Sequence, residues 1–220
     1  MDKQTPIIAK IVEQGLLPLF YHQEIAVCID LLRSLYTAGV RSVEFTNRGE
    51  AALANFKAMK QVCEIEMPEM YLGVGTIKNA SMAQGFIDAG ANFIISPGLV
   101  NEVAMLAKEK SLPWIPGCMT PTEIIAAETM GAKLVKLFPG NLLGPAFMSA
   151  IKDLFPGMLF MPTGGVDTSN ENIESWFNAG VSAVGMGSKL ISQYIMENRK
   201  YDLLISETKK LLQLIQRTRS

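Results

Sequence analysis

The chain has 220 residues, 49% of them hydrophobic, and its 20 basic and 21 acidic side chains leave a formal net charge of −1. This composition predicts a folded protein with a large buried core. The balanced charge excludes the basic surface expected of a protein that binds nucleic acid or an anionic membrane. No apolar run approaches the ~18 residues of a membrane span, and no basic segment leads into an apolar one at the N-terminus, so we expect a soluble, cytoplasmic protein.

The three cysteines, Cys28, Cys63 and Cys118, are odd in number and widely separated, and His22 is the one histidine. Zinc sites need closely spaced thiolates or imidazoles, which this set does not offer. We therefore expect free buried thiols, no metal site and no cofactor.

Hydrophobic periodicity and Gly/Pro punctuation predict a first helix at residues 6–14, followed by strands and helices in alternation. The predicted strands cover residues 16–21, 41–46, 71–76, 92–96, 113–116, 133–138, 158–162 and 182–186. The predicted later helices cover residues 24–38, 50–66, 81–89, 100–110, 121–130, 145–154, 170–179 and 201–219. Such alternation implies parallel strands. Eight βα units favour an α/β fold with a single (β/α)8 TIM barrel spanning residues 1–220, over a doubly wound sheet of five or six strands.

The last predicted helix is amphipathic, with charged residues on one side and an apolar stripe on the other. We expect the stripe to pack against the barrel or a neighbouring subunit. Its members are Leu203, Leu204, Thr208, Leu211, Leu212 and Ile215.

Lys136 lies within a run that otherwise predicts a buried strand, on the face that also carries Leu134 and Phe138. Burial among apolar side chains removes the hydration of an ammonium group and favours the neutral amine. A neutral lysine is a nucleophile that typically forms a Schiff base with a carbonyl substrate. Pro139 ends the strand just beyond it, so the amine lies at the C-terminal end, where parallel α/β proteins keep their chemistry. A lysine that extends to solvent is the alternative.

A second charged residue, Glu44, occupies a core position, because its neighbours in the strand are apolar and face the opposite side. A buried carboxylate needs a partner. Lys136 would serve as one and would give Glu44 a role in proton transfer, whereas an ion pair with Arg48 would make it structural. Arg48, just beyond the strand, has the planar fork that binds both oxygens of a carboxylate.

Glycines cluster where three predicted strands end. The two glycines in residues 73–76 match the first two glycines of the dinucleotide-binding motif. Lys78 stands in place of the third glycine of that motif, so we reject a dinucleotide site here. Residues 162–166 and 185–188 place glycine pairs at the last two strand ends, each expected to precede a helix start whose N–H groups attract anions. Barrels frequently bind phosphate there, and tight turns are the alternative reason for the glycines.

Six segments occur in order along the chain: residues 44–48 (EFTNR), 73–76 (GVGT), 95–99 (ISPGL), 115–117 (IPG), 135–139 (VKLFP) and 162–166 (PTGGV). In this combination the chain resembles the 2-keto-3-deoxy-6-phosphogluconate (KDPG) and 4-hydroxy-2-oxoglutarate (KHG) aldolase family. The resemblance runs from about the first strand to the eighth.

The resemblance implies a class I aldolase that needs no metal and is usually a homotrimer. Such an enzyme cleaves KDPG to pyruvate and glyceraldehyde 3-phosphate, or KHG to pyruvate and glyoxylate. Matched by position, Lys136 would form the Schiff base and Glu44 would be the general acid and base. The other matched residues are Arg48, Thr76, Pro97, Phe138 and Thr163 around the pyruvate portion, and Gly164, Gly165, Gly187 and Ser188 around the phosphate.

Three positions depart from the family pattern. Phe20 and Tyr21 stand where many relatives carry an arginine, Asn47 replaces a common leucine, and Gly140 and Asn141 replace a frequent alanine-led segment. We expect all three at the rim of the pocket, where they leave the aldol chemistry unchanged. The substrate therefore stays open, with the C4 epimer 2-keto-3-deoxy-6-phosphogalactonate as an alternative.

Two other classes of protein share some of these features. A phosphosugar isomerase or a phosphate-condensing synthase would use the same glycines and give Lys136 only an electrostatic role. A non-enzymatic barrel would bind a phosphorylated sugar acid without releasing pyruvate. Trapping of an imine separates these alternatives from an aldolase.

Overall fold

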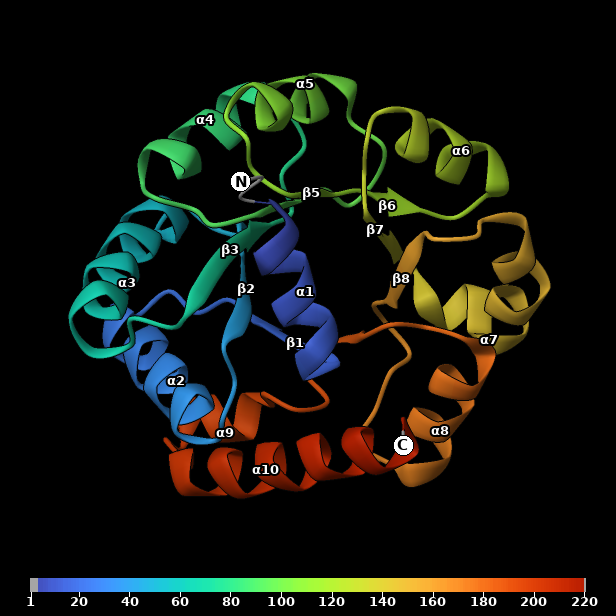
Figure 1. Ribbon diagram of the computed structural model, residues 1–220. Helices are drawn as coiled ribbons and strands as arrows, with labels where there is room; N and C mark the ends of the chain where they lie inside the picture. The colour runs from blue at the N-terminus through green and yellow to red at the C-terminus, as the bar shows by residue number, and fades with distance from the viewer. Residues whose placement is uncertain (1–3, 220) are drawn as a thin grey trace.

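The structure is a computed structural model that describes residues 4–219, in which strands alternate with helices as predicted. Figure 1 shows the helices that follow β1 arranged around the strands. The strands are β1 (Leu16–Phe20), β2 (Ser42–Thr46), β3 (Tyr71–Gly75), β4 (Ile94–Ile95), β5 (Trp114–Ile115), β6 (Gly117–Cys118), β7 (Leu134–Leu137), β8 (Leu159–Pro162) and β9 (Val184–Met186). The helices are α1 (Gln4–Gln14), α2 (Ile25–Thr37), α3 (Ala52–Glu66), α4 (Ala80–Asp88), α5 (Asn101–Glu109), α6 (Pro121–Thr129), α7 (Gly140–Ile151), α8 (Asn170–Ala179), α9 (Gln193–Glu197) and α10 (Tyr201–Thr218), with a 3₁₀ helix at Lys152–Leu154.

The strands form a curled parallel sheet of six strands, in the order β5-β4-β3-β2-β1-β9, and a parallel sheet of three, β6-β7-β8. The expected fifth strand, residues 113–116, is observed as β5, and a further short strand that was not predicted, β6, begins at Gly117. Pro116 separates the two, because it has no N–H to donate to a neighbouring strand. The sheets also meet at β8 and β9, where Thr163 bridges to Gly185 and the Ser182 N–H donates to the Phe160 carbonyl at 2.8 Å.

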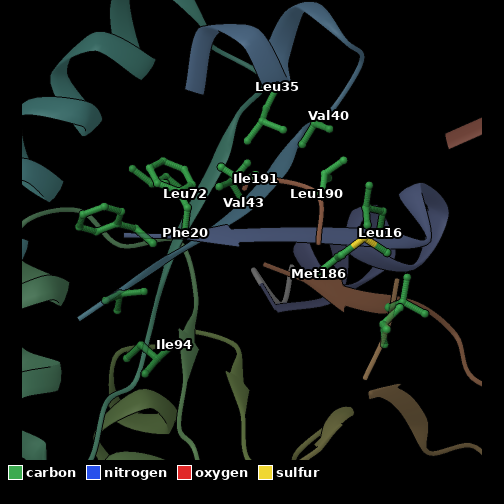
Figure 2. Packing of buried hydrophobic residues seen from close by; sticks show 14 of the residues in the cluster. Leu16, Phe20, Leu35, Val40, Val43, Leu72, Ile94, Met186, Leu190 and Ile191 are labelled. Carbon is green, nitrogen blue, oxygen red and sulfur yellow. The ribbon is translucent and has the colours of Figure 1, made fainter. Parts of the chain in front are cut away.

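Alternating residues along each strand enter two separate cores. One set packs outward against the helices, and Figure 2 shows Phe20, Val43 and Leu72 from three neighbouring strands in this outer core. The other set points inward and packs against α1, which lies across the centre of the strands in Figure 1. The inward set is Leu17, Phe93, Ile95, Ile115, Leu134, Met161 and Ala183, together with Ile7, Ile8 and Ile11 of α1.

The C-terminal helix α10 packs against α2 and α8. Its buried residues are Leu204, Thr208, Leu211 and Ile215, as the stripe predicts. The placement of Leu203 in that stripe is wrong, because 43% of its surface is exposed. The four buried positions repeat at helical spacing, and Leu203 lies one residue off the row they form.

Two predicted helix starts are wrong. Helix α7 begins at Gly140 instead of residue 145, and Gly144 (φ +71°) interrupts it, so that Pro145 opens its second part. No helix follows directly after Ser188, since α9 begins only at Gln193, where the Ser192 side chain accepts from the Ile195 N–H. Within residues 4–219 no helix is both long enough and apolar enough to cross a membrane.

Candidate active site

Lys136 and Glu44 meet on the inward side of the two sheets. Lys136 lies on β7 and Glu44 on β2, which belong to different sheets, and the Lys136 Nζ is 3.7 Å from Glu44 Oε1. Their side chains are 7% and 1% exposed. The sequence alternative, an ion pair of Glu44 with Arg48, does not occur among the described residues, where the cation beside Glu44 is Lys136.

Strand alternation directs both side chains inward. Val43 and Phe45 on β2, and Val135 and Leu137 on β7, belong to the outer core, so the residue between each pair faces the centre. Gly75 on the neighbouring β3 makes room for the carboxylate, because a Cβ atom there would clash with Glu44 Oε1.

The carboxylate of Glu44 has no hydrogen bond within residues 4–219, although both oxygens are buried, and the same holds for the Thr163 hydroxyl. An unsatisfied buried polar atom costs about 1–3 kcal/mol, and such atoms are rare in folded proteins. The separation of 3.7 Å from the amine exceeds a hydrogen bond, as is common for catalytic groups without substrate. The Glu44 carboxylate and the Thr163 hydroxyl are thus shielded from solvent and available to bind a ligand.

A cavity of about 410 Å³ opens at the C-terminal ends of β1, β2, β8 and β9. Seven of the predicted site residues line it: Arg48, Phe138, Thr163, Gly164, Gly165, Gly187 and Ser188. Two cations, Arg48 and Lys189, lie in its wall, and the wall contains no carboxylate. The cavity therefore favours an anionic ligand.

The other four predicted site residues lie deeper or to the side of this cavity. Lys136 adjoins it through Phe138, whose ring centre is 5.2 Å from the amine. Thr76 directly follows Gly75, which faces Glu44, and has φ +64°. This left-handed conformation is strained for a β-branched residue.

Pro97 lies beside the strand next to the lysine. Its carbonyl group is so close to Gly117 that a Cβ atom there would clash with it, and Gly117 pairs in register with Lys136. Pro97 therefore adjoins the strand residue that pairs with Lys136, and Thr76 adjoins the glycine that faces Glu44, whereas neither lines the cavity at β8 and β9.

Two glycine loops border the cavity. Gly164 (φ +86°) and Gly165 (φ +72°) adopt left-handed conformations that favour glycine, and the Asn172 side chain donates to the Gly165 carbonyl at 3.0 Å. Within the described residues, the backbone N–H groups of Gly164, Gly165, Ser188 and Lys189 donate to no protein acceptor. Successive free N–H groups of this kind form anion-binding concavities.

The expected helix starts do not supply these N–H groups. After β8 the next helix begins at Asn170, and after β9 the chain makes a single turn in which the Gly187 carbonyl accepts from Leu190 and Ile191. The loops themselves therefore present the donors, and the prediction of a helix dipole at this position is wrong.

Sequence reasoning missed several residues of the cavity wall. Lys189 follows the last glycine motif directly, which was a usable signal. Thr46 and Val166 lie within two of the segments that resemble the family, whereas Ile191 and Met196 carried no signal. Among the departures from the family pattern, Phe20 and Tyr21 line the cavity. Asn141 packs closely against Gly165, since a Cβ atom added to this glycine would lie 2.7 Å from the Asn141 Cα. Asn47 does not line the cavity, and its N–H donates to the Gly75 carbonyl.

The three cysteines are free and buried, as expected. Burial raises the pKa of the Cys118 thiol to about 12, so this neighbour of the site is not a thiolate nucleophile near neutral pH. Among residues 4–219, no three His, Cys, Asp or Glu side chains gather as metal ligands would.

Comparison with known proteins shows to which family the chain is similar. A family described as "KDPG and KHG aldolase" matches residues 7–206. The 2-dehydro-3-deoxy-phosphogluconate aldolase of Treponema pallidum is 35% identical over 155 residues, which cover 70% of this chain and 72% of that protein. The KHG/KDPG aldolase of Escherichia coli K12 is 32% identical over 154 residues, 70% of each chain.

A solved structure extends the likeness to three dimensions. The KDPG aldolase of Legionella pneumophila, crystallised with pyruvate captured as a covalent carbinolamine intermediate, superimposes with a TM-score of 0.83 at 25% identity, over 92% of this chain and 96% of that one. Thiamine phosphate pyrophosphorylase from Pyrococcus furiosus shares the fold alone, with a TM-score of 0.73 at 11% identity. With its sequence match over residues 7–206, the chain belongs to the KDPG and KHG aldolase family.

Proposed function

We propose that this aldolase cleaves 2-keto-3-deoxy-6-phosphogluconate to pyruvate and glyceraldehyde 3-phosphate through a Schiff base on Lys136. The observation that carries the proposal is the buried pair of Lys136 and Glu44, 3.7 Å apart and next to an anion-binding cavity. The carbinolamine described for the Legionella relative supports the same chemistry. A phosphosugar isomerase would form no imine on this lysine.

In the first stage, Glu44 takes a proton from Lys136, and the amine adds to the C2 carbonyl of the keto acid and forms a carbinolamine. Loss of water then leaves a protonated imine. Glu44 is the group within reach that can move the protons between the amine nitrogen and the departing hydroxyl.

In the second stage, Glu44 takes the proton of the C4 hydroxyl, and the C3–C4 bond breaks. Its electron pair moves into the protonated imine and forms an enamine, while C4 leaves as the aldehyde of glyceraldehyde 3-phosphate. Glu44 returns the proton to C3, and water hydrolyses the resulting pyruvate imine to release pyruvate and the free amine.

The remaining predicted residues bind the substrate. Arg48 suits the carboxylate, and the Thr163 hydroxyl, buried and without a partner among residues 4–219, suits an oxygen of the pyruvate portion. Thr76 and Pro97 adjoin the glycines next to the buried pair, and Phe138 lines the cavity with its ring centre 5.2 Å from the amine.

The phosphate would lie between the two glycine loops. The free N–H groups at Gly164, Gly165 and Ser188 point to such a site, which Gly187 borders, and glycine lets the backbone approach an anion closely. We expect KHG as a second, weaker substrate. The relatives include one named a probable 2-dehydro-3-deoxy-6-phosphogalactonate aldolase, from Rhizobium meliloti, so both C4 epimers belong in the assay.

The two sheets, we propose, are parts of one closed (β/α)8 barrel that forms a single domain. Three contacts support closure: the bridge between Thr163 and Gly185, the continuity of β5 with β6 across Pro116, and the meeting of Lys136 with Glu44 across the centre. A homotrimer in the cytoplasm is the expected setting, and light scattering after size-exclusion chromatography tests the subunit number.

Reductive trapping tests the function. The protein is incubated with pyruvate, reduced with borohydride and digested, and mass spectrometry is expected to find the adduct on Lys136. Lys136→Arg is the matched variant, because arginine keeps a positive charge beside Glu44 and cannot form the imine. An adduct on another lysine, or the same adduct in Lys136→Arg, would overturn the assignment.

A further inference from the structure

Lys189 lies in the cavity wall and has no role in the chemistry above. It follows Ser188, so its side chain starts from the same loop whose backbone N–H groups are free. The bridge between Thr163 and Gly185 places this loop beside the loop of Gly164 and Gly165. Lys189 is thus a cationic residue on the loop next to this cluster of backbone N–H donors.

A neighbouring carboxylate gives a second indication of where this ammonium lies. The pKa of Asp167 is below its usual range because the Ser169 hydroxyl and N–H donate to its carboxylate, and the positive charge of Lys189 lowers it further. Asp167 lies two residues beyond Gly165. The charge of Lys189 therefore acts on the loop that carries Gly164 and Gly165.

The two cations of the cavity lie at different places along it. Arg48 follows β2 and Lys189 follows β9, and β1 is the one strand between them. Two strand spacings separate these strand ends by about 10 Å. A cavity with a cation at each of two such positions and no carboxylate in its wall suits a substrate with an anion at both ends.

We propose that Lys189 is a specificity-determining residue: its ammonium binds the phosphate at the end of the substrate that lies away from the keto acid, and so favours phosphorylated substrates. The proposal rests on the aldolase function above. It separates the roles of the two cations, since Arg48 binds the carboxylate near Glu44. A six-carbon acid phosphate can reach both cations, whereas KHG has five carbons and carries its second carboxylate closer to the first.

The experiment compares Lys189→Gln with Lys189→Arg and with Lys133→Gln. Lys133 is exposed at the other end of β7, so its variant removes one charge far from the cavity. For Lys189→Gln we expect kcat/KM with the phosphorylated substrate to fall about tenfold, mainly through KM, because one hydrogen bond to a charged group is lost. Lys189→Arg restores most of the loss, and Lys133→Gln stays within about twofold of wild type.

Two further measurements make the result specific. Inorganic phosphate should inhibit Lys189→Gln about tenfold more weakly than wild type, and cleavage of KHG should change less than threefold. Equal losses with both substrates would overturn the assignment to the phosphate, and so would unchanged inhibition by inorganic phosphate.

Trapping with pyruvate distinguishes this inference from the proposed function. Pyruvate has no phosphate, so its borohydride adduct on Lys136 should form in Lys189→Gln as in wild type, which also shows that the variant is folded. A normal adduct with undiminished cleavage of the phosphorylated substrate refutes the role of Lys189 alone. Absence of the adduct in wild type refutes the aldolase mechanism itself.

Discussion

The two charged side chains at the centre of the site are almost inaccessible to water, at 7% exposure for Lys136 and 1% for Glu44. Their mutual attraction offsets part of the desolvation cost, yet a well-packed apolar pair commonly stabilises a core as well or better. Stability therefore does not explain why this pair is present. Chemistry does, because a dry amine next to one carboxylate can attack a keto acid and exchange protons with it.

Replacing Glu44 with Gln should lower kcat by about 10²–10⁴-fold and change KM by less than about threefold, since glutamine keeps the shape and loses the proton transfer. Steady-state kinetics with the phosphorylated substrate measures this. Glu69→Gln is the control, because Glu69 pairs with Arg41 at the opposite end of β2. A loss in KM alone would reassign Glu44 to substrate positioning.

Thr76 supplies a second test at the scale of single residues. The left-handed backbone of Thr76 (φ +64°) destabilises the folded state by about 1–2 kcal/mol, and glycine would remove this strain. Glycine would also make the unfolded chain more flexible, which lowers the free energy of unfolding by about 0.5–1 kcal/mol. We expect Thr76→Gly to unfold at the same or a slightly higher temperature while kcat/KM falls at least about tenfold, because the hydroxyl is lost.

Calorimetry and kinetics on Ser111→Gly provide the comparison for Thr76→Gly. Ser111 is exposed and also left-handed (φ +54°), but it lies between α5 and β5, away from the site. This control should keep full activity. Full activity in Thr76→Gly as well would show that the Thr76 hydroxyl does not contact the substrate.

At the scale of elements, the residues that stabilise the fold and those that form the site lie at different places along the strands. Helix α1 packs its three isoleucines against the inward residues, while the site lies at the C-terminal strand ends. Lys136 follows Leu134 on the same inward face, so the apolar cluster forms the floor beneath the reactive amine. This floor keeps water from approaching the amine from below.

Ile11 of α1 is fully buried in this floor, so Ile11→Ala should lower the free energy of unfolding by about 2–5 kcal/mol. Denaturation in urea measures this, and activity well below the unfolding temperature should remain within about threefold of wild type. Ile65→Ala is the control, because Ile65 is 83% exposed and its truncation should cost less than about 0.5 kcal/mol. Equal effects of the two variants would contradict the packing of α1.

At the scale of the whole molecule, the outer core excludes water and buries all three thiols. Burial disfavours the thiolate and raises the pKa of Cys28 and Cys63 to about 11 and that of Cys118 to about 12, from a usual value of 9.0. The folded protein therefore holds these protons to higher pH than the unfolded chain does. The stability contribution is complete below pH 9 and is lost as pH rises through 11 to 12.

The free energy of unfolding should accordingly fall between about pH 9 and 11, by at most about 1.4 kcal/mol per pH unit for each thiol. Urea titrations at several pH values measure the slope. The double variant Cys28→Ala and Cys63→Ala should show a shallower slope, since other groups titrate equally in both proteins. Identical slopes would show that the thiols are not shielded in the folded state.

The sequence by itself determined the alternation of strands and helices, the lysine at a strand end, the glutamate at a core position and the glycine loops. These features depend on neighbours along the chain, through side-chain periodicity and backbone freedom. Only the tertiary structure decided that Lys136 meets Glu44 and not Arg48, that β5 and β6 are separate strands, and that Lys189 enters the cavity wall. Such outcomes depend on how residues far apart in the chain are brought together when the strands curl around α1, and no local pattern encodes that distance.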